Sequence, residues 1–462
     1  MSIKNLTLEN INQDLTINYE NKINYGEIFT PFSFIEKMFN LIPEYYFNNF
    51  NLKWLDPGSG TGYFSIYLYF KLLKNLNNNF DTLENCKDHI IKNMIYIIEI
   101  NPENIVKLKL IFGEEANIFQ YDYLNVKDLS LPKFDFIIGN PPFNSNGLKK
   151  TPTNCQLKKT NDGSTIWIDF VKISIYNLNK PGFLLFITPS IWLKPDKAGM
   201  YKYLTQFKIH KLHALNNTEI NSIFNGHAQT PCTYFLLENQ NSNNKIDIYD
   251  FKLKKYINYT LNFNGPIPVF GVSIINKISK FLDNSNKLQV IKTNLPSNKT
   301  KIYNNYSKNL FKNIKTCKLN LLEPELEINY STKPCPYYGI IKLVMAHGMY
   351  GFPYLDLKGE YGISNRDKYI IINKNQQELI NLFKFFSTKT ALYLFECTRY
   401  RMKYLEKYIF ELLPDINKLN NFPIDINDES IALFFGFDDE ERSAINNLHK
   451  KKYKFFELKI SN

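Results

Sequence analysis

The first half of the chain alternates short apolar runs with longer segments in which apolar residues recur at helical spacing. The short runs predict strands at 52–56, 94–99, 118–121, 134–139 and 182–188, and the longer segments predict helices at 62–76, 102–113 and 164–178. Further strands are expected at 209–215 and 232–238, and a polar, asparagine-rich surface connection at 75–93. Strands that alternate with helices of this length predict an α/β fold, a parallel sheet covered by helices on both faces.

Beyond about residue 239 the alternation fades into lysine-rich and then aromatic-rich sequence, such as 382–395. The chain has 462 residues, more than one hydrophobic core usually organises. We therefore expect two domains, 1–240 and 241–462. No internal repeat is visible.

Composition excludes several classes of protein. No apolar run reaches the roughly 18 to 20 residues that span a bilayer, and the first 25 residues lack the features of a signal peptide. We expect a cytoplasmic protein with no membrane partner. The six cysteines contain no CxxC pair, and His210 and His213 stand three apart without neighbouring acids or cysteines. We therefore predict no metal site and no disulfide framework.

Positive charge is concentrated in one segment. The formal net charge is +12, and residues 251–320 contain 13 lysines and a single acid, Asp283. The rest of the chain balances at 43 basic and 43 acidic residues, from totals of 56 and 44. An AT-rich genome also favours lysine and asparagine, so lysine content alone is weak evidence. The local excess is typical of a surface that binds a polyanion.

A glycine-rich turn follows the first predicted strand and opens a helix. It reads Asp56-Pro-Gly58-Ser-Gly60-Thr-Gly62, and acids end the next two strands at Glu99 and Asp122. Glycines let a ligand approach the backbone closely, and an acid in the position of Glu99 can bind both hydroxyls of a ribose. Asp122 could accept a hydrogen bond from an adenine amino group. Each feature alone is also common in ordinary turns and at solvated strand ends.

The strongest signal is Asn140-Pro141-Pro142-Phe143, delivered by the apolar strand at 134–139. This turn falls at the carboxyl edge of the predicted sheet, where ligands bind in such folds. The prolines restrict the backbone, so that the Asn140 amide oxygen and the Pro141 carbonyl can converge on one amino group. Phe143 offers a flat face on which a base can stack.

Together these motifs resemble the gamma class of DNA adenine-N6 methyltransferases, of the type II restriction-modification kind that includes Eco57I and TaqI. The order along the chain is the same: Gly26-Glu-Ile-Phe29-Thr30-Pro31, then the glycine turn, the acid and the Asn-Pro-Pro-aromatic turn. The resemblance covers residues 25 to about 238. Farther on, 410–416 resembles the tail of Eco57I-type enzymes.

The resemblance implies a Rossmann-like methyltransferase domain, dependent on S-adenosylmethionine, and a C-terminal target-recognition domain that binds double-stranded DNA. It implies that Asn140, Pro141, Pro142 and Phe143 hold a flipped adenine. It also implies that Phe29, Thr30, Asp56, Gly58, Gly60, Glu99 and Asp122 bind the cofactor. We expect a monomer without a nuclease of its own, beside a separate cognate restriction endonuclease, in a bacterial cell or in the host cytoplasm or virus factory of a virus.

The turn alone does not identify the acceptor. Enzymes that methylate RNA bases or protein glutamine present a similar planar amino group to the same turn. A non-catalytic DNA-binding subunit with a methyltransferase fold is a further alternative, which the intact Asn140 turn disfavours. Six residues of the C-terminal half would suit contacts with DNA, although each is more typical of packing or of an ordinary surface: Tyr350, Phe352, Tyr354, Arg366, Arg399 and Arg401.

Overall fold

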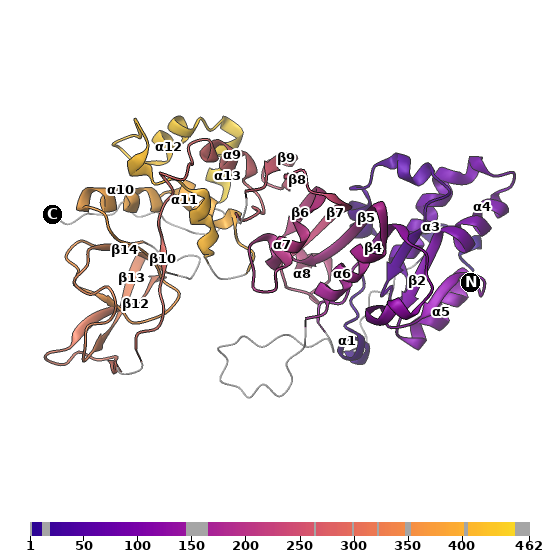
Figure 1. Ribbon diagram of the computed structural model, residues 1–462, viewed down its shortest axis with the longest axis horizontal. Coiled ribbons are helices and arrows are strands. Elements are labelled where there is room, and N and C mark those ends of the chain that lie inside the picture. Colours follow the sequence, from indigo (N-terminus) through magenta and orange to yellow (C-terminus); the bar gives the residue numbers. More distant parts are fainter. Residues whose placement is uncertain are drawn as a thin grey trace. The chain divides into compact units, whose positions relative to one another are not determined.

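The computed structural model describes residues 2–11, 19–144, 165–262, 265–297, 300–320, 323–346, 353–401 and 405–448. The chain divides into two compact units (Figure 1). Unit 1 comprises Met1–Trp192 and Asp196–Asp247, and unit 2 comprises Leu193–Pro195 and Ile248–Asn462. That the two units are a catalytic and a target-recognition domain stays a prediction.

Unit 1 alternates helices and strands. Its helices are α1 (Tyr19–Tyr25), α2 (Phe32–Phe39), α3 (Tyr63–Leu76), α4 (Leu83–His89), α5 (Pro102–Phe112), α6 (Trp167–Asn177), α7 (Met200–Leu204) and α8 (Asn217–Ile223). Its strands are β1 (Trp54–Pro57), β2 (Ile95–Glu99), β3 (Asn117–Gln120), β4 (Phe134–Gly139), β5 (Leu178–Pro189), β6 (Phe207–Leu215) and β7 (Cys232–Asn241). β8 (Lys245–Asp250) carries the chain across the boundary between the units.

The seven strands that lie wholly in unit 1 have the order β3-β2-β1-β4-β5-β7-β6. β1 to β5 pair in parallel, which confirms the predicted α/β fold. β7 pairs antiparallel to both β5 and β6, a reversal that the expectation of a purely parallel sheet missed. The order changes direction at β1 and β4, so the carboxyl ends of these two strands flank a crevice of the kind in which α/β folds bind ligands.

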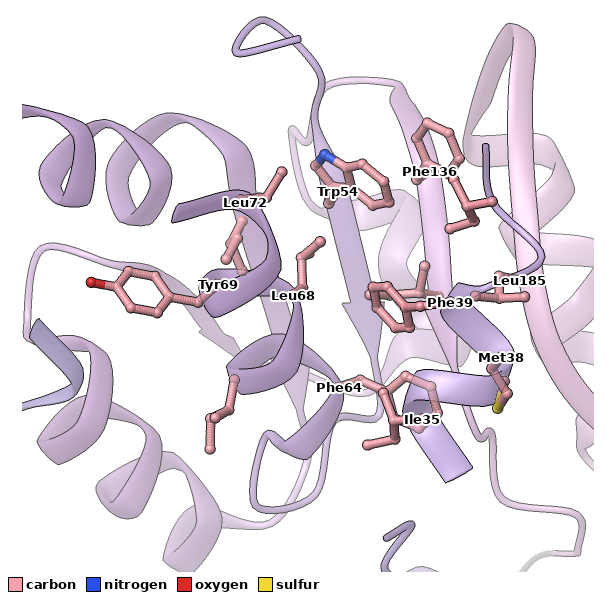
Figure 2. Packing of buried hydrophobic residues seen from close by; sticks show 14 of the residues in the cluster. Ile35, Met38, Phe39, Trp54, Phe64, Leu68, Tyr69, Leu72, Phe136 and Leu185 are labelled. Carbon is pink, nitrogen blue, oxygen red and sulfur yellow. The ribbon is translucent and has the colours of Figure 1, made fainter. Parts of the chain in front are cut away.

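Helices cover both faces of this sheet. On one face, Phe39 of α2 and Leu68 of α3 belong to a buried cluster with Trp54 of β1, Phe136 of β4 and Leu185 of β5 (Figure 2). The rings of Trp54 and Phe136 stack with centroids 4.0 Å apart. Helix α6, which contributes no residue to this cluster, packs against β5. The strands that flank the crevice are therefore anchored in the buried core of unit 1.

The asparagine-rich connection at 75–93 is helical in part and contributes to the core of unit 1, which corrects the expectation of a surface insertion. It contains α4 and a π-helical turn, Ile90–Met94, and it buries Cys86, Ile90 and Ile91 in the core. Its apolar residues are too sparse among polar ones to show helical spacing. Thr82 begins α4 by accepting a hydrogen bond from the Asn85 N–H.

Unit 2 mixes short strands and helices. Its strands are β9 (Lys255–Thr260), β10 (Ile291–Lys292), β11 (Ile302–Tyr303), β12 (Phe311–Asn320), β13 (Glu323–Ser331), β14 (Lys342–Met345), β15 (Tyr354–Asp356), β16 (Gly362–Ile363) and β17 (Tyr369–Ile371). Its helices are α9 (Val272–Ser279), α10 (Gln376–Phe386), α11 (Lys389–Cys397), α12 (Asp428–Phe435) and α13 (Asp439–Asn447). Eight of the strands form two four-stranded sheets, β10-β17-β14-β15 and β11-β13-β12-β16. Across the described residues of the chain, the helices are too short or too polar to cross a bilayer.

Candidate functional site

The glycine-rich turn joins β1 to α3 and is fastened to the end of β2. The N–H groups of Gly58 and Ser59 donate to the Ile98 carbonyl at 2.8 and 3.1 Å. Gly58 and Gly60 have φ angles of +71° and +56°, in the left-handed region that a Cβ disfavours. Glycine at these two positions therefore allows the turn to form and leaves its backbone open toward the crevice.

Glu99 is buried at the end of β2 and holds the same turn. Its carboxylate accepts hydrogen bonds from the N–H groups of Gly60, at 2.7 Å, and Asn101, at 2.8 Å. Burial raises the pKa of Glu99 to about 7, because desolvation outweighs these two donors. Glu99 thus has a structural role beside the ligand-binding role that the sequence suggests.

Asp56 is a second buried carboxylate beside this turn. It accepts a hydrogen bond from the Ser65 hydroxyl at 2.8 Å. Burial, with a smaller contribution from the charge of Glu99, raises the pKa of Asp56 to about 7. Two neighbouring carboxylates with raised pKa values are typical of a functional site.

A pocket of about 790 Å³, open to solvent, lies over the turn. Four carboxylates line it: Glu27, Asp56, Glu99 and Asp122. None of the described lining residues is lysine or arginine. The charge of this pocket therefore disfavours a polyphosphate or dinucleotide ligand and suits a cationic one.

Asp122 follows β3 and also caps a short 3₁₀ helix, Tyr123–Asp128. Its carboxylate accepts hydrogen bonds from the Leu124 N–H at 3.0 Å and the Asn125 side-chain amide at 2.9 Å. The cap fixes the position of a residue that lines the pocket, so a ligand contact by Asp122 would add to an existing structural role.

Three buried polar atoms at the turn and at the start of α5 find no hydrogen-bond partner among the described residues. They are the hydroxyl oxygens of Ser59 and Thr61 and the side-chain nitrogen of Asn101. Ser59 and Thr61 line the pocket itself. Buried polar atoms are usually paired, so their orphaned state is consistent with a polar ligand that completes the site.

The Asn140 turn lies against the segment 25–30. The side-chain nitrogen of Asn140 donates to the Thr30 hydroxyl at 3.2 Å. This bond uses the amide nitrogen, so the amide oxygen is the atom left to accept a hydrogen bond from a substrate. A Cβ on Gly26 would lie 3.1 Å from Cβ of Pro142, so the glycine allows the two segments to approach closely.

A second pocket, of about 1070 Å³ and open to solvent, adjoins this turn. Phe143 lies on one wall, and Phe224 with the loop that joins α8 to β7 forms another. The described lining residues include no acid, lysine or arginine, so the pocket suits a neutral planar group. Asn140 and Pro142 line both pockets, which therefore meet at the turn.

The structure brings the predicted site residues together. The first pocket is lined by Phe29, Thr30, Asp56, Gly58, Gly60, Glu99, Asp122, Asn140 and Pro142, and the second by Asn140, Pro141, Pro142 and Phe143. Both sets lie in unit 1. What each residue does with a ligand stays a prediction.

Sequence reasoning missed other residues around the two pockets. Glu27 lines the first pocket and accepts a hydrogen bond from the Asn104 side chain at 2.7 Å, and burial raises the pKa of Glu27. Its place beside Gly26 could have indicated it. Phe170, on α6, and Phe224, at the end of α8, carry no local signal, because each stands in an ordinary amphipathic pattern.

The two histidines considered as metal ligands are not among the residues that line the two pockets. His210 bonds to Glu238 at 2.7 Å and His213 to the Tyr234 hydroxyl at 2.5 Å, and burial lowers the pKa of His213 to about 4. Within the described residues, no three His, Cys, Asp or Glu side chains gather as metal ligands.

Of the C-terminal candidates, Tyr350 and Phe352 fall outside the described residues. The arginines pair with acids: Arg366 with Asp367, Arg399 with Glu396 and Arg401 with Glu406. Tyr354 packs against a small buried cluster of unit 2.

The chain is similar to known proteins over part of its length. Residues 62–224 match the family model described as Eco57I restriction-modification methylase. No curated protein sequence matches the chain.

Several solved structures are similar. One is a modification subunit of a putative type I restriction enzyme from Vibrio vulnificus YJ016, at 17% identity and a TM-score of 0.36, with 48% of this chain and 46% of that chain covered. Another is the EcoKI M protein of a type I restriction enzyme, at 17% identity and a TM-score of 0.36, with 48% of each chain covered. A third is the type IIL restriction-modification enzyme MmeI in complex with DNA, at 14% identity and a TM-score of 0.49, with 94% of this chain and 72% of that chain covered.

The chain thus spans about half the length of the two type I subunits. The family match runs from the end of the glycine turn, through Glu99 and the Asn140 turn, to Phe224. S-adenosylmethionine is the cofactor expected of this methyltransferase fold. Over residues 62–224 the chain is therefore similar to the Eco57I restriction-modification methylase family.

Proposed function

We propose that this protein transfers a methyl group from S-adenosylmethionine to the N6 amino group of an adenine in a specific DNA sequence. One observation carries the proposal: an acidic pocket and a neutral pocket meet at Asn140 and Pro142. A methyl donor in the first and a base in the second would face each other across the turn.

The residues of the acidic pocket fit S-adenosylmethionine, which carries a sulfonium and an ammonium group. Four carboxylates suit that charge, and the orphaned atoms of Ser59 and Thr61 suit its polar groups. Glu99 would hold the ribose hydroxyls, Asp122 the adenine, and Phe29 and Thr30 the methionine portion. When bound, the cofactor supplies an electrophilic methyl group.

The Asn140 turn would prepare the acceptor. Adenine N6 is a weak nucleophile, because its lone pair is delocalised into the ring. The Asn140 amide oxygen and the Pro141 carbonyl would each accept a hydrogen bond from one N6–H group, which favours a tetrahedral nitrogen with a localised lone pair. These hydrogen bonds strengthen as positive charge develops on N6, so they stabilise the transition state more than the ground state.

The other requirement of the reaction is that the adenine and the methyl donor be aligned. An adenine in duplex DNA is paired and stacked, so it must be flipped out at a cost of a few kcal/mol. Phe143 would stack on the flipped base in the neutral pocket. Alignment of two reactants can contribute roughly 7 to 11 kcal/mol, so no covalent nucleophile is needed.

Two other acceptors share the chemistry of the turn. A protein glutamine or an RNA base could present a similar amino group to Asn140. Unit 2 favours nucleic acid over protein, because more than 200 residues with a lysine-rich start exceed what recognition of a glutamine needs. The family match to a restriction-modification methylase favours DNA over RNA. We further propose a monomer whose cognate restriction endonuclease is a separate chain.

The acceptor class can be tested with methyl-labelled S-adenosylmethionine and three acceptors in parallel: duplex DNA, RNA and a protein mixture. We expect label in DNA alone, and none when Asn140 is replaced by alanine. Label in RNA or protein instead of DNA would overturn the proposed acceptor, and label in DNA that Asn140→Ala retains would overturn the proposed role of the turn. A chain that binds DNA but transfers no label to any acceptor would be a binding subunit.

A further inference from the structure

Two groups stand out among the 13 lysines of the basic segment 251–320. Five of them pair with acids that stand elsewhere in the sequence of unit 2: Lys255 with Glu440, Lys277 with Asp438 and Glu441, Lys287 with Glu411, Lys292 with Asp367, and Lys315 with Glu327. The sequence excess of +12 therefore overstates the free positive charge on the surface. The segment cannot be treated as one uniform DNA-binding surface.

A second group lies in or next to strands β11 and β12 of the small sheet β11-β13-β12-β16. Lys301, Lys308 and Lys312 are exposed, and none of them forms an ion pair with a described residue. Lys301 precedes β11, Lys312 lies in β12, and Lys308 lies in the exposed connection between these strands. Their charges remain available to a partner.

Exposed tyrosines stand beside these lysines. In the antiparallel register, Tyr303 of β11 and Lys312 of β12 both lie opposite Tyr330 of β13. Residues directly opposite each other share a face of the sheet, so the three side chains form one row. The ring of Tyr306 packs edge-on against Tyr330, with centroids 5.3 Å apart. Tyr303 is 43% exposed and Tyr306 is 65% exposed.

We infer that this tyrosine–lysine face, made of Lys301, Tyr303, Tyr306, Lys308 and Lys312, contacts the phosphate backbone of duplex DNA. Ammonium groups and tyrosine hydroxyls are donors that proteins use to bind phosphate oxygens. The acids of β13 lie toward the other end of the hairpin: Glu323, Glu325 and Glu327 are paired in register with Asn320, Lys318 and Thr316. The face is therefore cationic where the tyrosines are exposed.

Phosphate contacts fix a protein on DNA without reading its sequence. The inference rests on the proposed function, because it takes the same duplex as its partner. It assigns the non-specific, salt-dependent part of binding to three lysines and leaves base reading to other residues of the chain.

The test measures duplex affinity across a salt series for the full chain and two charge-matched variants. One variant is Lys301→Gln with Lys308→Gln and Lys312→Gln. The control is Lys255→Gln with Lys287→Gln and Lys292→Gln, which removes three lysines that already form ion pairs. Each phosphate contact contributes about 0.9 to the slope of log affinity against log salt.

We expect the first variant to weaken binding to duplexes of any sequence and to flatten the slope by up to about 3 units, while the control keeps the unaltered slope. A first variant that keeps the slope, or a control that flattens it equally, would overturn the inference and leave the proposed methyl transfer intact. An unaltered chain that binds no duplex would overturn both. Thermal unfolding of all three proteins confirms that affinities are compared between folded chains.

Discussion

Asn140 is the residue on which the proposed chemistry depends most. Its side-chain nitrogen donates a hydrogen bond to the Thr30 hydroxyl, and the residue lines both pockets. The strand and turn that place it are local in sequence, which is why its position could be predicted from the pattern at 134–143. The orientation of its amide by Thr30 could not, because the two residues are 110 positions apart.

Asn140→Ala should abolish methyl transfer and leave affinity for S-adenosylmethionine near that of the unaltered protein, because the lost acceptor acts on the base. Transfer rates and calorimetric cofactor binding measure the two effects separately. Activity within tenfold of the unaltered protein would contradict the proposed role of the amide.

Phe143 is expected to stack on the flipped base. Phe143→Ala should impair transfer and weaken binding of DNA that contains an unpaired target base, by about 1 to 3 kcal/mol. Phe143→Tyr should be tolerated, since the stacking face survives. Fluorescence of 2-aminopurine at the target position reports on the flipped base, and equal effects of the two substitutions would argue against stacking.

Asp56 and Glu99 should make cofactor binding depend on pH. Burial raises the pKa of each carboxyl to about 7, and a cationic ligand favours the ionised forms. Affinity should therefore rise as the pH increases through about 7 and level off above it. The same raised pKa values mean that these groups lower the stability of the ligand-free fold as pH rises from their ordinary values toward 7.

Glu99→Gln should weaken cofactor binding by about 1.5 to 3 kcal/mol, because charge-assisted hydrogen bonds are lost. It should also move the remaining pH dependence to lower pH, since the charge of Glu99 contributes to the raised pKa of Asp56. Calorimetry at several pH values tests both effects, with exposed Glu114→Gln as the control. Cofactor binding that is unaltered in Glu99→Gln would place Glu99 outside the ligand site.

At the level of elements, the sequence predicted the strands and helices that follow from the local spacing of apolar residues. β4 begins and ends where its apolar run does, and α3 follows the glycine turn as expected. The antiparallel direction of β7 and the helix α4 were missed, because strand direction and the burial of a few apolar side chains depend on distant partners.

The glycine turn is the element whose shape matters most for the ligand. Gly60→Ala should cost about 1 to 2 kcal/mol of stability, since φ is +56° there, and should also weaken cofactor binding. Gly199→Ala is a matched control: its φ is +72°, nothing lies within 4 Å of the added Cβ, and the residue is not among those that line the pocket. It should lose stability alone. Chemical denaturation and calorimetry distinguish the two, and equal cofactor affinity in both variants would contradict a ligand role for the turn.

At the level of the whole molecule, charge is the property that sequence predicts least well. The lysine-rich segment 251–320 looks uniform in sequence, yet five of its lysines are partnered by acids that only the fold brings near. The two pockets differ in charge, and this difference cannot be seen in the sequence. Their contrast between an acidic and a neutral lining arises from residues scattered between Tyr25 and Cys232.

Nucleoside analysis of DNA is the most direct test of the central claim, that adenine N6 in DNA is the acceptor. The chain and its Asn140→Ala variant would be produced separately in a host without adenine methylation of its own, and the digested DNA examined by mass spectrometry. N6-methyladenine should appear with the unaltered chain and be absent with Asn140→Ala. Unmodified adenine in both samples, or methyl groups on cytosine instead, would contradict the proposed function.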